Sequence, residues 1–213
     1  MLKVKIFPLG VLSTNCYLVY SDKEAVAIDP GGEASEVLNF LEQNNLTLTH
    51  ILNTHLHFDH IQGNAFLSKA TGVTIWASEK DKYLLENELG LGGFMDFPET
   101  PEFSFQNLEP GPLQVLNTTC EVLSTPGHSP GSLSFYFPAI KAVFVGDLIF
   151  FRSIGRTDFP GGDQEVLFKS AREKILTLPS ETIIYPGHGE ATTVGEEKLH
   201  NPYLNPHLRG GLF

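Results

Sequence analysis

The stretch Thr54-His55-Leu56-His57-Phe58-Asp59-His60 holds four metal-capable side chains within six residues. Imidazole and carboxylate groups suit zinc, iron or manganese as ligands. Along an extended path His55 and His57 point to the same side, because side chains alternate in direction. These two imidazoles can therefore hold one ion, while Asp59 either joins them or turns with His60 toward a second ion. The alternative is a polar loop that acquired this spacing by chance.

Three other apolar runs end in a similar way. Each leads into a Gly or Pro turn with one ligand-type residue: Cys120–Ser124 leads to His128, Ala142–Val145 to Asp147, and Thr182–Tyr185 to His188. Sites in open α/β sheets lie outside strand ends, and glycine permits the close backbone approach that an ion site needs. The strand ends together supply seven candidate metal ligands: His55, His57, Asp59, His60, His128, Asp147 and His188.

Seven ligands exceed one tetrahedral site and suit two ions. Three further histidines stand outside this pattern, and we interpret them as structural or solvent-exposed: His50, His200 and His207. Asp29, in the turn Asp29-Pro30-Gly31-Gly32, is interpreted either as a turn residue or as a partner that orients the metal-binding loop.

Alternating and apolar runs predict further strands over Leu2–Leu9, Asn15–Tyr20, Ala25–Ile28, Leu48–Asn53, Val73–Ala77, Leu113–Asn117 and Ser132–Phe137. Helical spacing is found in Glu33–Gln43, Gly63–Lys69, Glu79–Glu86, Gln164–Leu176 and Gly195–Leu199. Ser78 is expected to cap the third of these, with Asp81 completing a capping box. This order favours mixed sheets with helices outside.

The segment Leu89–Pro112 is rich in Gly, Pro and Phe and shows no clear period. It is either a functional lid or an irregular surface crossing with aromatic anchors. Within it, Phe94 and Phe97 are candidates for a substrate wall. Tyr203 in the C-terminal segment is a further candidate.

Composition bounds the class of protein. The length of 213 residues favours a single domain over residues 1–213, and 41% hydrophobic residues support a sizeable core. The net charge of −11 argues against nucleic acid as a partner. Two distant cysteines, Cys16 and Cys120, form no disulfide framework. Without an export signal or a membrane-length apolar run, a soluble, cytoplasmic protein without a membrane partner is expected.

The motif His55-Leu56-His57-Phe58-Asp59-His60, followed in order by His128, Asp147 and His188, resembles the metallo-β-lactamase superfamily. The resemblance covers nearly the whole chain. It implies an α+β, four-layer αββα sandwich with two mixed β-sheets and flanking helices. It also implies the ligand sets: His55, His57 and His128 for a first metal, Asp59, His60 and His188 for a second, and Asp147 as a bridge.

Within that superfamily the sequence most resembles glyoxalase II, the hydroxyacylglutathione hydrolases. The matching segments are Gly146–Phe150, Gly155–Phe159, Pro186–Gly189 and His200–Leu204. Full-length glyoxalase II adds a C-terminal helical domain that helps to bind glutathione, whereas only residues 189–213 follow His188 here. This difference puts glutathione specificity in doubt, though not hydrolysis.

The resemblance implies thioester hydrolysis by a metal-bridging hydroxide, with two divalent ions, zinc or else iron or manganese. Asp59 is the candidate catalytic residue that orients the hydroxide and relays its proton. Arg156 is the candidate substrate-binding residue for the anionic end of a small-molecule thioester such as a glutathione conjugate. A surface salt bridge from Arg156 to Asp158 or Asp163 is the alternative.

Other functions remain as rivals. Segments Gly155–Phe159 and Lys174–Pro179 also resemble persulfide dioxygenases, which use one iron, although Gly189 stands where those enzymes would have Asp. A β-lactamase is disfavoured because no export signal is seen, and a non-catalytic metal-binding module because all seven ligands are present. Metal identity, the acyl group, the thiol and the oligomeric state stay open.

Overall fold

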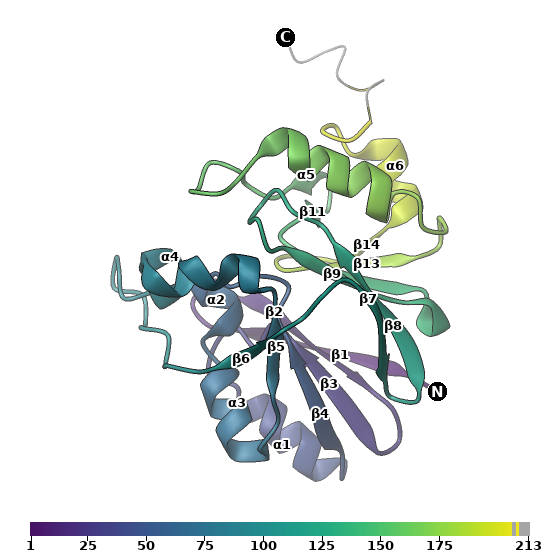
Figure 1. Cartoon of the computed structure of the whole chain (residues 1–213). Helices are drawn as coiled ribbons and strands as arrows, with labels where there is room; N and C mark the ends of the chain where they lie inside the picture. Colours follow the sequence, from purple (N-terminus) through teal and green to yellow (C-terminus); the bar gives the residue numbers. More distant parts are fainter. Residues whose placement is uncertain (206–207, 209–213) are drawn as a thin grey trace.

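Two six-stranded β-sheets face each other at the centre of the molecule, and helices lie on their outer sides (Figure 1). This computed structural model describes residues 1–205 and 208. The first sheet contains, in spatial order, β1 (Lys3–Leu9), β2 (Thr14–Tyr20), β3 (Glu24–Ile28), β4 (Thr47–Leu52), β5 (Ile75–Ala77) and β6 (Phe105–Asn107). Its first three strands pair antiparallel, and the pairs from β3 to β6 are parallel.

The second sheet has the same mixed character. Its spatial order is β14 (Thr192–Thr193), β13 (Ile183–Pro186), β10 (Ala142–Gly146), β9 (Leu133–Phe137), β8 (Thr118–Ser124) and β7 (Gly111–Val115). Only β10 and β13 run parallel; the other neighbours are antiparallel. A separate short hairpin consists of β11 (Ile149–Phe150) and β12 (Ser153–Ile154). The predicted four-layer sandwich with two mixed sheets is confirmed.

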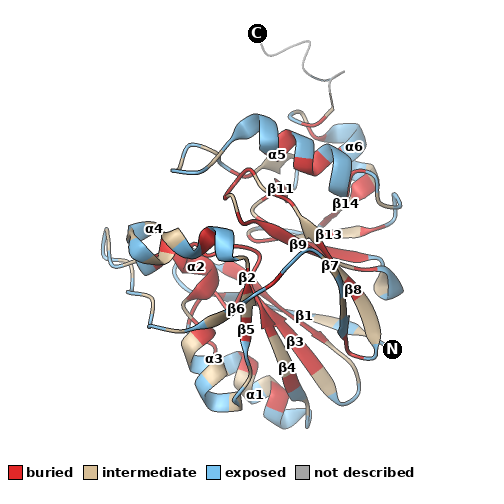
Figure 2. Ribbon diagram, in the orientation of Figure 1, coloured by how far each residue is buried: buried red, intermediate tan, exposed pale blue. Residues whose placement is uncertain are grey.

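Side-chain alternation divides each central strand between two cores. In β10, Phe144 packs between the sheets, whereas Val143 and Val145 face the outer helices. In β2, Tyr17 packs between the sheets and Leu18 faces the helices on the other side. The central strands are accordingly buried, whereas exposed residues lie on the outer helix faces, the loops and the edge strands such as β1 (Figure 2).

The outer layers are built from the helices α1 (Ser35–Gln43), α3 (Asn64–Thr71), α5 (Gln164–Ser170) and α6 (Val194–His200). Val37 of α1 and Leu67 of α3 pack on the first sheet, and Leu167 of α5 packs on the second. The remaining short helices are α2 (Phe58–Ile61), η1 (Glu79–Glu86), α4 (Glu88–Leu91), η2 (Pro138–Ile140) and η3 (Ala171–Ile175). Across residues 1–205 and 208, no helix is long and apolar enough to cross a membrane.

Two predicted helices differ in type from an ordinary α-helix. Glu79–Glu86 is a 3₁₀ helix, and the predicted capping box is wrong. Ser78 does cap it by accepting from the Lys80 amide, but Asp81 turns inward to a different loop. The predicted helix Gln164–Leu176 is an α-helix in its first half and a π-helix in its second.

The irregular segment Leu89–Pro112 contributes more structure than its sequence suggests. Its residues Phe105–Asn107 form β6, the sixth strand of the first sheet. The tip between Phe94 and Phe97 is a tight turn, in which the Phe97 amide donates to the Phe94 carbonyl at 2.9 Å. The segment therefore contains a strand and an aromatic turn, and a role as a lid stays a prediction.

Both cysteines are buried and unbonded to each other, as small apolar residues of their strands. The C-terminal segment docks as far as the structure describes it, because Asn201 and Leu204 are buried. His207 lies outside the described residues.

Candidate metal centre

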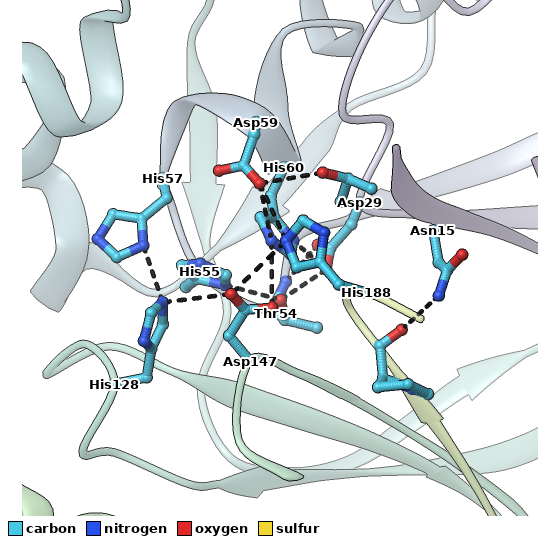
Figure 3. Close-up of polar contacts among 12 residues, drawn as sticks. Asn15, Asp29, Thr54, His55, His57, Asp59, His60, His128, Asp147 and His188 are labelled. Atoms are coloured by element: carbon cyan, nitrogen blue, oxygen red, sulfur yellow. Dashed lines mark hydrogen bonds and ion pairs between the residues drawn. The ribbon is translucent and has the colours of Figure 1, made fainter. Parts of the chain in front are cut away.

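Four loops at one end of the two sheets bring the seven candidate ligands together (Figure 3). β4 of the first sheet leads to His55 and His57, and the short helix α2 carries Asp59 and His60. From the second sheet, the loops after β8, β10 and β13 bring His128, Asp147 and His188. Their donor atoms form three groups, each with all atoms within 4.8 Å of one another.

The first donor group contains His55, His57 and His128, all of them buried. Nδ1 of His57 lies 2.9 Å from Nε2 of His128, and the His55 and His57 rings are perpendicular at 4.7 Å. The Nδ1–H of His128 donates to the Arg156 carbonyl at 2.7 Å, which leaves Nε2 as an acceptor. Burial, followed by the charge of His128, lowers the pKa of His57 to about 3. Neutral imidazoles of this kind are the form that binds metals.

The second donor group contains Asp59, His60 and His188. Oδ2 of Asp59 lies 3.1 Å from Nε2 of His188 and 3.5 Å from Nε2 of His60. Thr14 of β2 donates to the same Asp59 oxygen at 3.0 Å and fixes its orientation. This group therefore combines one carboxylate with two imidazoles.

Asp147 lies between the two donor groups. Its Oδ1 is 3.4 Å from Nε2 of His60, and its Oδ2 is 3.7 Å from Nε2 of both His128 and His188. The third group of donor atoms, with His55 and His60, includes this carboxylate. One carboxylate thus reaches donors of both groups.

Asp29 orients imidazoles of both groups. The sequence had suggested this role as one of two alternatives. Its carboxylate accepts from the Thr54 amide at 2.7 Å, from the Thr54 hydroxyl at 2.6 Å and from Nδ1 of His60 at 3.0 Å. Because the Thr54 hydroxyl donates to Asp29, it can accept from Nδ1 of His55 at 3.0 Å. Both rings then present Nε2 lone pairs to the cluster. The residue is also a turn residue, with φ of 51°.

A clamp from β2 holds the loop of His188, and no sequence pattern indicated it. The Asn15 side-chain amide donates to the carbonyls of Pro186 and Gly189, and the Tyr17 hydroxyl donates to Pro186 at 2.6 Å. These residues are 171 and 169 positions away from Pro186, so only the fold pairs them. Gly187 is required here because a Cβ would lie 2.2 Å from Oδ1 of Asp147.

Charges within the cluster are strongly coupled. Although burial opposes it, the carboxylates of Asp59, Asp147 and Asp29 raise the pKa of His60 well above its usual value. Conversely, His60 lowers the pKa of Asp147 despite the burial of that carboxyl. The three carboxylates therefore create a negative potential at Nε2 of His60, which favours a cation there.

These donors fit metal ions. Three of their buried atoms have no hydrogen-bond partner: Nε2 of His55, Nε2 of His60 and Oδ1 of Asp147. Unsatisfied buried polar atoms are costly, and all three belong to the donor groups. The set of imidazole and carboxylate ligands suits zinc, iron or manganese.

Aromatic rings border the cluster. Phe159 contacts His57 edge-on at 5.8 Å, and Phe150 lies 6.2 Å from His188. Phe58, between two ligands in sequence, stacks on Phe97, and Phe94 packs against both. A substrate wall at Phe94 and Phe97, like one at Tyr203, stays a prediction.

Arg156 pairs with Asp158, as the alternative interpretation anticipated. Its guanidinium donates two hydrogen bonds to that carboxylate, at 2.8 and 2.7 Å, and lies 3.7 Å over the Phe159 ring. Because Phe159 touches His57, Arg156 is one ring away from the first donor group. Its role in substrate binding stays a prediction.

The other histidines lie apart from the donor groups. His50 is half-buried next to Thr49, with 3.1 Å between Nδ1 and the threonine hydroxyl, and His200 is exposed at the end of α6.

Comparison with known families gives one match, to the metallo-beta-lactamase superfamily over residues 9–188. The chain belongs to the metallo-β-lactamase superfamily. The matched range contains all seven candidate ligands. Members of this superfamily are metal-dependent hydrolases, and the donor groups described above indicate divalent metal ions.

Two curated relatives span nearly the same length. The chain is 40% identical to hydroxyacylglutathione hydrolase GloC of Haemophilus influenzae over 96% of its own length and 99% of that protein. It is 36% identical to the probable metallo-hydrolase YqgX of Bacillus subtilis, over 96% of this chain and 98% of the relative.

Solved structures agree with the fold. The chain resembles the B3 metallo-beta-lactamase BLEG-1 with a TM-score of 0.90 and 40% identity, over 95% of this chain and 100% of that one. A di-iron-bound form of TTHA1623 matches with a TM-score of 0.85 and 38% identity, over 94% of this chain and 100% of that one. ETHE1 from Myxococcus xanthus matches with a TM-score of 0.76 and 29% identity, over 100% of this chain and 92% of that one.

Proposed function

We propose that the chain is a dinuclear thioester hydrolase of the hydroxyacylglutathione (glyoxalase II) type. The observation that carries the proposal is the position of Asp147, whose two oxygens reach donors of both groups. In this proposal the first donor group would hold one ion and the second donor group the other, and the Asp147 carboxylate would be available to both. The name and full-length similarity of the GloC relative support the thioester substrate.

Two divalent ions, zinc or else iron or manganese, would act there as Lewis acids and lower the pKa of a water molecule to roughly 7. Asp59 orients the attacking water and takes up its proton. The Thr14 hydroxyl and His188 both engage Oδ2 of Asp59, so that oxygen is fixed in place. The departing thiolate is a weak base and leaves without a dedicated acid.

Arg156 is proposed to bind the anionic end of the substrate. Its side chain is 55% exposed, so a carboxylate from solvent can reach it. Asp158 occupies the guanidinium fork, and an incoming carboxylate would replace it in the same two-hydrogen-bond geometry. Phe159 beneath the guanidinium keeps this group next to His57.

The test combines elemental analysis with three assays on protein purified without added metal. We expect close to two metal ions per chain and hydrolysis of S-lactoylglutathione. About one iron per chain, no thioester hydrolysis and oxygen uptake with glutathione persulfide would instead establish the dioxygenase that Gly155–Phe159 resembles. Hydrolysis of a chromogenic cephalosporin without thioester hydrolysis would establish the activity named for BLEG-1.

A matched pair of variants tests the role of Asp59. Asp59→Asn should lower kcat for the thioester by at least about 100-fold, as expected for loss of a general base. Asp163→Asn is the control, because the Asp163 carboxylate caps α5 at the Val166 amide and is not one of the donor atoms. Equal kcat values for the two variants would exclude Asp59 as the base.

A further inference from the structure

Asp81 is a buried carboxylate with no place in the chemistry described above. It lies on the 3₁₀ helix η1 and is 0% exposed. The side chains of Glu79, Lys80 and Lys82 on the same helix are exposed. Residues three apart align in a 3₁₀ helix, and Leu84, three positions after Asp81, is also fully buried. One face of η1 thus carries a carboxylate and a leucine into the protein.

This carboxylate joins the two loops that supply the first donor group. Ser129, directly after His128, donates its hydroxyl to Oδ2 of Asp81 at 2.6 Å, and the Gly131 amide donates to Oδ1 at 2.6 Å. The backbone amide of Leu56, which lies between His55 and His57, faces the same carboxyl and favours its ionised form. Asp81 therefore interacts with neighbours of all three histidines of that group, through hydrogen bonds on the His128 side.

The surrounding loop is shaped around the carboxylate. A Cβ at Gly131 would lie 2.6 Å from Cγ of Asp81, so only glycine permits this approach. Ser132 accepts from the Ser129 amide, and the two hydroxyl oxygens lie 2.7 Å apart. The apolar side of the contact is also closed, because Leu84 and Leu56 belong to one buried cluster. The helix η1, Gly131 and the two serines therefore pack closely around the Asp81 carboxylate.

General stability alone does not account for a carboxylate here. The ion pairs that lysine and arginine form within residues 1–205 and 208 do not include Asp81. Burying a carboxylate without a cation is costly, and burial raises the pKa of Asp81 accordingly. A carboxylate nevertheless has one advantage, since its two oxygens accept from several donors at once and offer no competing donor.

We propose that Asp81 is a positioning residue that fixes the spacing of the His55–His57 loop and the His128 loop, and thereby sets the metal affinity of the first donor group. The inference rests on the proposed assignment of that group as a metal site. It adds a residue from η1, which supplies no ligand, to the machinery of the site.

The experiment measures Zn²⁺ affinity by competition with a chromophoric chelator. All variants carry His188→Ala, which removes a donor of the second group and leaves the first group intact. Asp81→Asn keeps the shape but places an amide donor against the loop donors. We expect it to weaken Zn²⁺ binding by about 10- to 100-fold, the usual effect of losing a partner that orients metal ligands.

Glu197→Gln is the matched control. Glu197 is also 0% exposed and accepts hydrogen bonds from Arg152, Thr192 and Asn201. These bonds tie α6 to the turn of the β11–β12 hairpin, to β14 and to the residue that follows α6. It should lower thermal stability while Zn²⁺ affinity stays within about twofold. If Asp81→Asn behaves in the same way, Asp81 is merely structural and the inference is wrong.

Ser129→Ala keeps the test decisive where Asp81→Asn fails to fold. Loss of one hydrogen bond to the carboxylate should weaken Zn²⁺ binding by about two- to tenfold. Unchanged affinity in this folded variant would also overturn the inference. By contrast, a parent protein that binds none of Zn²⁺, Fe²⁺ and Mn²⁺ would overturn the proposed function itself.

Discussion

Replacing Asp29 by Asn should weaken the metal centre by changing the tautomer of His60. One oxygen of Asp29 accepts from the Thr54 amide, and the other accepts from both the Thr54 hydroxyl and Nδ1 of His60. Asn offers one oxygen and one NH₂ group in the same space. If the NH₂ faces His60, Nδ1 must become the acceptor, and the proton moves to Nε2, the atom that faces the donor groups. If the NH₂ group faces the Thr54 amide instead, two N–H donors point at each other and the Thr54 amide loses its acceptor.

Either orientation of the substituted side-chain amide carries a cost that can be estimated. A buried donor left without an acceptor costs about 1–3 kcal/mol. Where that cost falls on His60, it weakens metal binding by about 10- to 100-fold, which is the usual effect of removing a partner of a metal-bound histidine. Because Thr54 also links Asp29 to His55, both donor groups should be affected.

The assay is a Zn²⁺ competition titration, and weaker binding is expected. Asp163→Asn again serves as the control, since Asn caps a helix as well as Asp does and this side chain accepts from the Val166 amide rather than from a donor group. Zn²⁺ affinity within about twofold of the parent protein would refute the argument.

The remaining predictions concern metal removal, the substrate end and one strained turn. Removing bound metal with a chelator should lower Tm by about 10 °C, because ligand at about 1,000 times its Kd contributes roughly 4 kcal/mol; an unchanged Tm in a calorimetric scan would contradict a bound metal. Arg156→Ala should raise KM for S-lactoylglutathione several-fold with little change in kcat, whereas Arg172→Ala, on the outer helix layer, should not; equal KM values for the two variants would remove Arg156 from the site. Since Arg156 lowers the pKa of Asp158 to about 2, their pair stays ionised at neutral pH. The KM effect should therefore be the same from about pH 5 to about pH 8, and a strong pH dependence would point to another group. Met95 is 82% exposed and has φ of 49°, so Met95→Asn should stabilise the chain by up to about 1 kcal/mol, seen as a Tm increase of about 2–4 °C; a lower Tm would show that Met95 makes contacts that compensate its backbone strain.

The sequence was most informative where a pattern is local. Alternation in strands such as the predicted Ser132–Phe137, observed as Leu133–Phe137, depends only on neighbouring residues and was sufficient to predict mixed sheets with helices outside. The spacing of His55, His57 and His60 is equally local, and it carried the family resemblance that implied the sandwich. Asp81 shows the limit. Its position three residues after Ser78 satisfies the local rule for a capping box, yet its true partners are 48 and 50 residues away. A buried tertiary contact thus takes the place of the local capping interaction.

The clamp on His188 was invisible for the same reason, and it has a consequence for folding. Asn15 and Tyr17 belong to the first sheet, whereas Pro186 ends β13 of the second sheet and Gly189 follows it. The second donor group takes Asp59 and His60 from the first half of the chain and His188 from near its end. It can therefore form only after both sheets have come together. Because any ion held there binds both sheets at once, metal binding and the docking of the two sheets must stabilise each other to the same extent.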